Sequence, residues 1–148
     1  MKKTATWKPG TMPALLIGAA ARLMARRDDE RLQRVGLRVA QLPVLVALKN
    51  GERLTQKALA HIAGVEQPSM AQLLMRMERD GLIQRTPDPA DGRSSLVSLT
   101  PSAIERLEPG RDMLRLGNDE ALAGFTAEET DQLLGMLHRI LRNLERHD

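Results

Sequence analysis

The chain contains no cysteine and almost no aromatic residues. Its 148 residues include one Trp, one Phe and no Tyr. A core must therefore be built from Leu, Ile, Val, Ala and Met, and this composition favours helices over sheets. The absence of cysteine excludes disulfide bonds, thiolate metal ligands and a cysteine-based redox switch. It is compatible with a reducing cytoplasm, which is where we expect the protein to act.

The sequence also lacks the signatures of enzymes and of membrane proteins. No apolar run is long enough to span a membrane, and the short apolar stretch of residues 14–21 is cut off by Arg22. There is no GxSxG, P-loop or dinucleotide-binding motif, and no pair of carboxylates in an apolar setting. His61, His138 and His147 lack the spacing of metal ligands. We therefore predict no enzymatic activity, no cofactor and no metal site.

The formal net charge is only +3. Such a charge permits a basic surface without requiring one, so the case for a nucleic-acid partner depends on where the cations lie. The informative stretch is residues 54–100, which we interpret as a helix, a turn, a second helix and a two-stranded hairpin. This order of elements is that of a winged helix-turn-helix, which binds duplex DNA.

The first helix of this stretch begins after Thr55, whose hydroxyl can cap it. Gly64 ends it, because glycine readily adopts the left-handed conformation in which helices terminate. Four apolar residues form its predicted core-facing stripe, namely Ala58, Leu59, Ile62 and Ala63.

The second helix begins near Gln67, since Pro68 suits the first turn of a helix. One face is apolar and comprises Met70, Leu73, Leu74 and Met77. The opposite face carries small polar residues followed by cations, namely Ser69, Gln72, Arg76 and Arg79. Short polar side chains suit base edges in a major groove, and arginines suit phosphates or guanines. Taken alone, this helix fits an ordinary amphipathic surface helix equally well.

The predicted hairpin follows directly, with strands at residues 83–86 and 96–99 and a long turn between them. Arg93 stands at its tip, where it can enter the negatively charged minor groove. The alternative is a solvated loop arginine. We expect Asp91 to hold Arg93 or a nearby arginine by a charge-assisted hydrogen bond.

At these positions the sequence resembles the DNA-binding core of the MarR family of transcriptional regulators. The resemblance rests on Leu54-Thr55-Gln56, Gly64-Val65, Gln67-Pro68-Ser69, Glu78-x-x-Gly81-Leu82-Ile83, Asp91-x-Arg93 and Leu99-Thr100. It implies a homodimer, usually a repressor on a pseudo-palindromic operator, that is often released from double-stranded DNA by a small aromatic or phenolic effector or by oxidation.

The resemblance also assigns roles to individual residues. It implies that Arg76 faces the DNA backbone, that Arg93 enters the minor groove, and that bases are faced by Gln67, Ser69, Ala71 and Gln72. Two positions depart from the family pattern. Ala71 stands where a threonine is common, so a base contact there has to be apolar. Met75 stands where an acidic residue is common, so any ion pair organised around that residue is absent here.

The flanks are expected to be helical. We predict a loose arm over residues 1–11 and a first helix over about residues 12–27. The charged residues 28–35 either continue this helix or form a tight connection that ends at Gly36. Residues 42–48 are apolar all round and predict a buried helix with Pro43 in its first turn. Thr100-Pro101 starts another helix, in which Pro109-Gly110 predicts a kink or a short break.

A capping box, Thr126-x-x-Glu129, opens the last helix. Its apolar stripe comprises Leu133, Leu134, Leu137, Ile140, Leu141 and Leu144. Such a helix packs either within one chain or against a second copy, and we predict a dimer interface because two-fold dimers bind paired half-sites. The predicted fold is mainly α with a small β-hairpin wing. Residues 39–100 form the winged helix-turn-helix, intertwined in one domain with a helical dimerisation region of residues 1–38 and 101–148.

The resemblance places an effector pocket between the dimerisation helices and the DNA-binding lobe. An anionic aromatic ligand requires a cation, and by location the candidates are Arg22, Arg26 and Arg38, for each of which a solvated charge is an equally good interpretation. The rival to a DNA-binding regulator is a protein-interaction module that keeps the winged helix but does not bind DNA. Grouping of Arg76, Arg79 and Arg93 on one side argues against this alternative.

Overall fold

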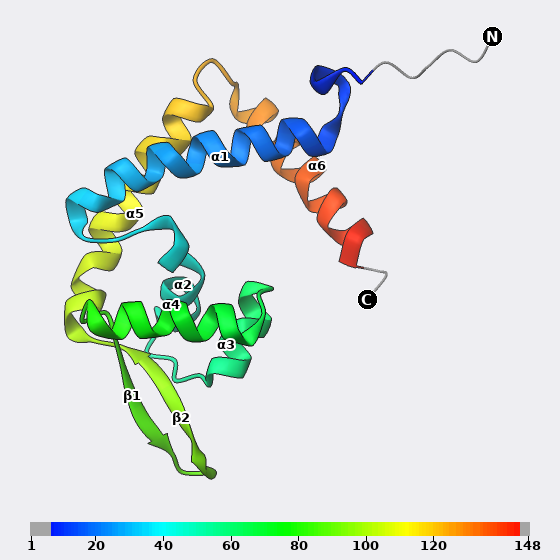
Figure 1. Ribbon diagram of the computed structural model, residues 1–148. Coiled ribbons are helices and arrows are strands. Elements are labelled where there is room, and N and C mark those ends of the chain that lie inside the picture. Colours follow the sequence, from blue (N-terminus) through cyan, green and yellow to red (C-terminus); the bar gives the residue numbers. More distant parts are fainter. Residues whose placement is uncertain (1–6, 146–148) are drawn as a thin grey trace. The chain divides into compact units, whose positions relative to one another are not determined.

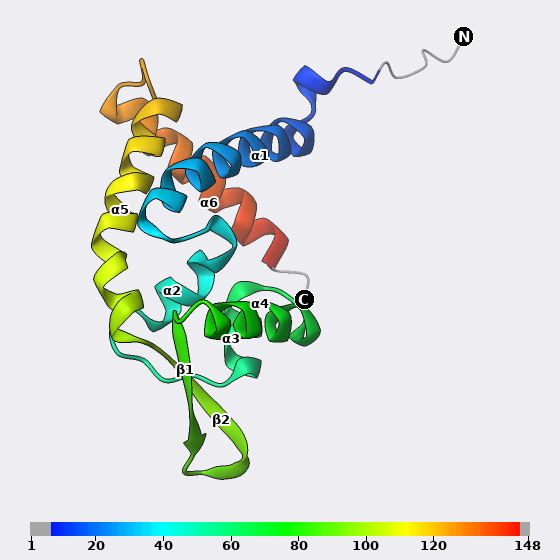
Figure 2. The ribbon, with the colours of Figure 1, turned by 60° about the vertical axis from the view of Figure 1, so that its left-hand side comes forward.

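The computed structural model describes residues 7–145, which form two compact units, one ending at Leu114 and the other beginning at Arg115. The first unit contains most of the elements, with the two strands projecting from the helices as a hairpin (Figures 1 and 2). Its complete α-helices and strands are α1 (Pro13–Leu32), α2 (Leu42–Leu48), α3 (Gln56–Ala63), α4 (Gln67–Arg79), β1 (Ile83–Asp88) and β2 (Asp91–Leu99), and it also contains the short 3-10 helices Pro9–Thr11, Gln33–Val35 and Val39–Gln41. Helix α5 (Pro101–Ala121) begins in this unit, and α6 (Ala127–Glu145) lies in the second. No helix within residues 7–145 has the length and apolar character needed to cross a membrane.

Helix α1 continues through the charged residues after Arg27 to Leu32, which is one of the two alternatives predicted for this segment. A turn of 3-10 helix, Gln33–Val35, then leads to Gly36, whose φ of 74° ends the segment in the left-handed conformation. Asp29 stabilises the 3-10 turn Val39–Gln41, since its Oδ1 accepts a 2.7 Å hydrogen bond from the main-chain N–H of Val39. In the predicted arm, Pro9–Thr11 forms another 3-10 turn, whereas residues 1–6 lie outside the described part of the chain.

The core of the first unit lies where α2, α3, α4 and the hairpin meet. Buried side chains come from every one of these elements, for example Leu45, Leu59, Leu74 and Val97. The prediction that residues 42–48 are buried all round is only partly right, because Val46 remains 58% exposed.

The stripe predicted for α3 is wrong at one of its four residues, since Ala58, Leu59 and Ala63 are buried or half-buried and Ile62 is exposed. Ala60 is buried beside Leu59, while Ile62 is 57% exposed. Helix α3 packs against both α2 and α4, and the small Ala60 is part of the buried core, whereas Ile62 is not. The two ends of the helix form as predicted, with the Thr55 hydroxyl accepting from the N–H of Ala58 at 3.1 Å and Gly64 in the left-handed conformation.

The hairpin strands are longer than predicted, and the turn is correspondingly short. Pairing runs from Ile83 opposite Leu99 to Pro87 opposite Ser95, with a register shift at Asp88. Residues that were predicted to form the long turn are therefore mostly strand, and the tip is reduced to Pro89 and Ala90. Pro87 is compatible with this because an edge strand has no need of its missing N–H.

Helix α5 passes through Pro109-Gly110, so the short break allowed by the sequence is wrong. Gly110 is buried against the connection that follows α1, and a Cβ on it would lie only 2.7 Å from Leu37 Cδ1. The glycine thus permits close packing of α5 on Leu37. Tertiary contact maintains a helix that local propensity alone would interrupt.

The second unit shows the predicted capping box at the start of α6. The N–H of Glu129 donates to Thr126 Oγ1, and the N–H of Thr126 donates to Glu129 Oε1, both at 3.0 Å. None of the residues of α6 is buried. Its apolar stripe is half-buried at Leu133 and Leu137 and exposed at Leu134, Ile140, Leu141 and Leu144.

The close contact at Gly110 predicts that a larger residue there destabilises the protein. We expect Gly110→Val to lower the free energy of unfolding by about 1–3 kcal/mol, the usual cost of overpacking a filled core. Gly135→Val is the matched control, because Gly135 is also inside a helix but has open space around its Cβ position. Chemical denaturation at fixed protein concentration measures both variants. Equal stability of Gly110→Val and wild type would show that Leu37 moves aside freely.

Candidate nucleic-acid interface

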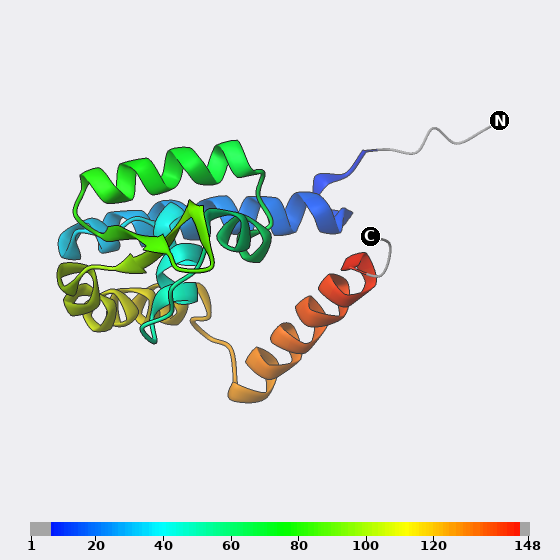
Figure 3. The same cartoon turned by 90° about the horizontal axis from the view of Figure 1, so that it is seen from below.

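Helix α4 has one face sealed in the core and one face open to solvent. Met70, Leu74 and Met77 are completely buried, as the sequence predicted, and Leu73 is half-buried. The opposite face lies on the outside of the first unit, as the view from below shows (Figure 3). Of the predicted DNA-binding residues on α4, Ala71 is half-buried and the others are exposed, namely Gln67, Ser69, Gln72, Arg76 and Arg79.

The two arginines of this face lie in the C-terminal part of α4, and both are accessible. Arg79 Nε is 3.6 Å from Asp80 Oδ1. Both side chains of this pair are largely exposed, so the pair contributes little to stability. Another anion can therefore readily replace Asp80 as the partner of Arg79. Arg76 and Arg79 can therefore both take phosphate groups as partners without loss of a buried ion pair.

Arg85 connects the end of α4 to the hairpin, a contact that was not predicted from the sequence. Its Nε lies 3.6 Å from Glu78 Oε1, and the Arg85 side chain is only 29% exposed. The ion pair joins the last turn of α4 to strand β1. Strand alternation puts Arg85 on the same side of β1 as Ile83, which is the one signal in the sequence that it faces inward.

Thr100 fixes the base of the hairpin from the other side. Its hydroxyl donates to the carbonyl of Gly81 at 2.6 Å and accepts from the N–H of Ala103 at 3.2 Å. One side chain thus caps α5 and holds the turn that follows α4. Together with the Glu78–Arg85 pair, this contact orients the hairpin relative to α4.

The tip of the hairpin presents Arg93 to solvent. Asp91 does hold this residue, because its Oδ1 accepts a 3.0 Å hydrogen bond from the N–H of Arg93. The donor is the main-chain N–H and not the guanidinium on which the prediction centred. Asp88 makes an equivalent bond to the N–H of Ala90 at 2.9 Å. Two carboxylates therefore shape the tip locally while the Arg93 side chain extends from it.

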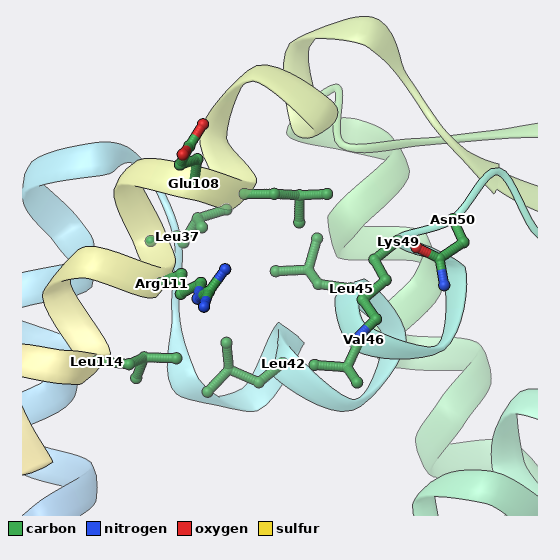
Figure 4. Close-up of a pocket in the computed structure, with 11 residues that line it drawn as sticks. Leu37, Leu42, Leu45, Val46, Lys49, Asn50, Glu108, Arg111 and Leu114 are labelled. Atoms are coloured by element: carbon green, nitrogen blue, oxygen red, sulfur yellow. The ribbon is translucent and has the colours of Figure 1, made fainter.

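A separate cavity of about 610 Å³ lies between α2 and α5 in the first unit. It is lined mainly by apolar side chains, among them Leu42, Leu45 and Leu114. Its cations are Lys49 and Arg111, and Arg111 extends from α5 toward α2 (Figure 4). Glu108 is the acidic residue of the lining.

The three arginines proposed for an effector lie elsewhere. Arg22 and Arg26 are exposed on α1, Arg38 is exposed before a 3-10 turn, and all three are absent from the lining of the cavity. His61 and His138 are exposed, and His147 lies outside the described residues. Within residues 7–145, no cluster of three or more His, Asp or Glu side chains has the geometry to hold a metal ion.

Comparisons with known proteins agree with this geometry. The model of the MarR family matches residues 35–94. An uncharacterised HTH-type transcriptional regulator of Bacillus subtilis, YwoH, is 30% identical over 126 residues, which are 85% of this chain and 91% of the relative.

Two crystal structures extend the similarity to the fold. A probable transcriptional regulator from Pseudomonas aeruginosa is 29% identical with a TM-score of 0.82, covering 90% of this chain and 99% of that one. A mutant of MarR from E. coli, complexed with operator DNA, superimposes with a TM-score of 0.82 at 24% identity, covering 93% and 99% of the two chains. At this identity the second structure shows a shared fold.

Proposed function

Because this chain belongs to the MarR family of transcriptional regulators and is therefore a regulator rather than an enzyme, we propose that it binds a specific duplex sequence as a homodimer and represses transcription. The observation that carries the proposal is the exposed face of α4, where polar and cationic side chains are grouped beside a projecting hairpin with an arginine at its tip. No part of this surface is needed for the core. It is therefore free to contact a partner.

In the proposed complex, α4 lies in the major groove. Gln67, Ser69 and Gln72 contact base edges, and Ala71 contributes apolar contact alone. Arg76 and Arg79 neutralise phosphates. Helix α4 has the order of side chains that this placement requires, since its polar residues precede its arginines.

The hairpin extends the proposed contact to an adjacent minor groove. The six residues of β1 span about 20 Å at the rise of an extended strand. Arg93 sits at the end of this span, and a narrow minor groove attracts a guanidinium by its negative potential. Asp91 orders the tip through its hydrogen bond to the main-chain N–H of Arg93. The preorganised position of Arg93 compensates for the unfavourable negative charge of Asp91 near DNA.

The proposed homodimer follows from apolar surface that one chain leaves uncovered. Exposed apolar side chains occur along α1 and along α6, and they include Leu15, Leu16, Leu23, Leu134, Leu141 and Leu144. Soluble proteins rarely leave large apolar patches in water. Association of these helices with those of a second copy would bury it, and a two-fold dimer would present two α4 helices to paired half-sites.

The cavity between α2 and α5 supports a role for a small effector. Its volume of about 610 Å³ is within the range of pockets for small organic ligands. Apolar walls with Lys49 and Arg111 suit an aromatic acid, whose carboxylate would pair with a guanidinium. Both walls belong to the unit that carries α4, so a ligand that binds one conformation better would shift the population of DNA-competent molecules.

A salt titration tests DNA binding against the rival proposal of a protein-interaction module. Operator fragments are first selected from genomic DNA, and the affinity is then measured at increasing salt. Arg76, Arg79 and Arg93 in both copies would release counterions, so we expect a roughly 1,000-fold loss of affinity between 50 and 200 mM salt. Failure to select any sequence, or an affinity independent of salt, would favour the protein-interaction module.

Removal of the Arg93 side chain tests the role of the hairpin. We expect Arg93→Ala to weaken operator binding by about 1–3 kcal/mol per half-site, as for a specific groove contact. Asp91→Asn is the matched control, because the amide oxygen keeps the hydrogen bond to the Arg93 N–H and should preserve affinity. Unchanged binding of folded Arg93→Ala in an anisotropy titration would exclude Arg93 from the interface.

A charge in the stripe of α6 tests the dimer. Leu137→Asp should convert the protein to monomers in sedimentation equilibrium, since an unpaired carboxylate in an apolar interface is strongly unfavourable. Gln132→Asp adds the same charge to the opposite, polar side of α6 and should remain dimeric. A Leu137→Asp mass still equal to two chains would place the interface elsewhere.

The effector pocket is tested with benzoate and its neutral analogue benzamide. Benzoate should bind more tightly by calorimetry, and Arg111→Gln should remove this preference by deleting a charge-assisted bond of about 1.5–3 kcal/mol. Arg22→Gln removes an arginine that does not line the cavity and should leave the preference intact. Loss of the preference in Arg22→Gln alone would move the site to α1.

A further inference from the structure

Met75 is a large apolar residue exposed at the centre of the face of α4 that we propose to contact DNA. Its side chain is 66% exposed, although α4 buries two other methionines, Met70 and Met77, completely. Met75 therefore contributes little to the core. Isolated exposed apolar residues are common on proteins and by themselves indicate nothing.

The neighbours of Met75 on the helix indicate what its exposed side chain faces. Gln72, Met75, Arg76 and Arg79 follow one another at i, i+3, i+4 and i+7, so they form one stripe along α4. All four are exposed. If Gln72 contacts a base edge and Arg79 a phosphate at the border of the groove, the Met75 side chain between them along the helix faces the groove as well. Met75 cannot then remain in water.

The chemistry of the thioether restricts what Met75 can contact. It donates no hydrogen bond and accepts only weakly, so it would leave a polar base edge or a phosphate without its water and without a replacement partner. The apolar group that unmodified DNA offers in the major groove is the 5-methyl of thymine. The flexible, polarizable methionine side chain adapts easily to such a group.

We infer that Met75 selects thymine at one position of each half-site through apolar contact with the 5-methyl group. The inference rests on the proposed DNA-binding function and adds a specificity-determining residue to it. Met75 lies about 4.5 Å further along the helix axis than Gln72, compared with about 3.4 Å between successive base pairs. It can therefore contact a base pair next to that contacted by Gln72. Ala71, which was expected to supply the apolar base contact, is only half-exposed.

Single replacement of each operator thymine by deoxyuridine tests the inference, since deoxyuridine lacks only the methyl group. We expect wild-type protein to lose about fourfold in affinity at one thymine per half-site, the effect of one buried methyl group. Met75→Ala and the length-matched Met75→Gln should bind thymine and deoxyuridine equally there, and Met75→Leu should keep the preference. Substitution of that base pair by one with 5-methylcytosine should weaken wild-type binding less than substitution with cytosine.

Ile62→Ala is the matched control, because Ile62 is an apolar residue of α3 that is also more than half exposed and lies outside the α4 stripe. It should retain the deoxyuridine effect in full. A deoxyuridine effect that persists in Met75→Ala, or is absent from wild type, overturns the inference while leaving operator binding intact. Absence of any specific DNA binding by the wild-type protein overturns the proposed function together with the inference.

Discussion

Burial of one face of α4 is the constraint on which the rest of the structure depends. Met70, Leu74 and Met77 are completely buried where α4 packs against α3, β1 and the 3-10 turn Val39–Gln41, and this fixes the rotation of the helix about its axis. Since side chains repeat every 3.6 residues, a fixed rotation determines which residues face outward. The polar and cationic residues and the neighbouring Met75 are exposed because the opposite side of the helix is buried in the core. Stability and the proposed recognition surface thus have a common origin.

The hairpin acts on this surface only if its direction is defined, and two polar contacts at its base provide that definition. The Thr100 hydroxyl bonds to the Gly81 carbonyl, and the Glu78–Arg85 pair bridges α4 and β1. Each contact is modest in energy. Their value is geometric, because Arg93 lies at the far end of the strands, where a small rotation at the base becomes a large displacement. Carboxylates that bond to main-chain N–H groups at the tip limit the remaining freedom.

Membership of the family, shown by sequence and fold, means that the protein regulates transcription. The proposed dimer and effector, in contrast, rest on features of this chain. Apolar side chains left uncovered on α1 and α6 support association with a second copy. The cavity between α2 and α5 combines apolar walls with two cations, Lys49 and Arg111, and one carboxylate, Glu108, and this excess of positive charge favours an anionic ligand. Both proposals concern surfaces outside α4, and they describe how the same DNA-binding element would be presented and controlled.

The order and type of the elements, their caps and the buried face of α4 were all predictable from the sequence, because they depend on local patterns: the Thr55 and Thr100 caps, the Thr126–Glu129 box, and apolar spacing. The family resemblance also held. Other features were decided by the tertiary structure. Helix α5 continues through Pro109-Gly110, where Gly110 packs on Leu37. Ala60 replaces Ile62 in the core. The cavity is lined by Arg111 and not by the three arginines proposed from the sequence, namely Arg22, Arg26 and Arg38. Each of these depends on a contact between residues distant in the chain, which no local pattern of spacing or propensity contains.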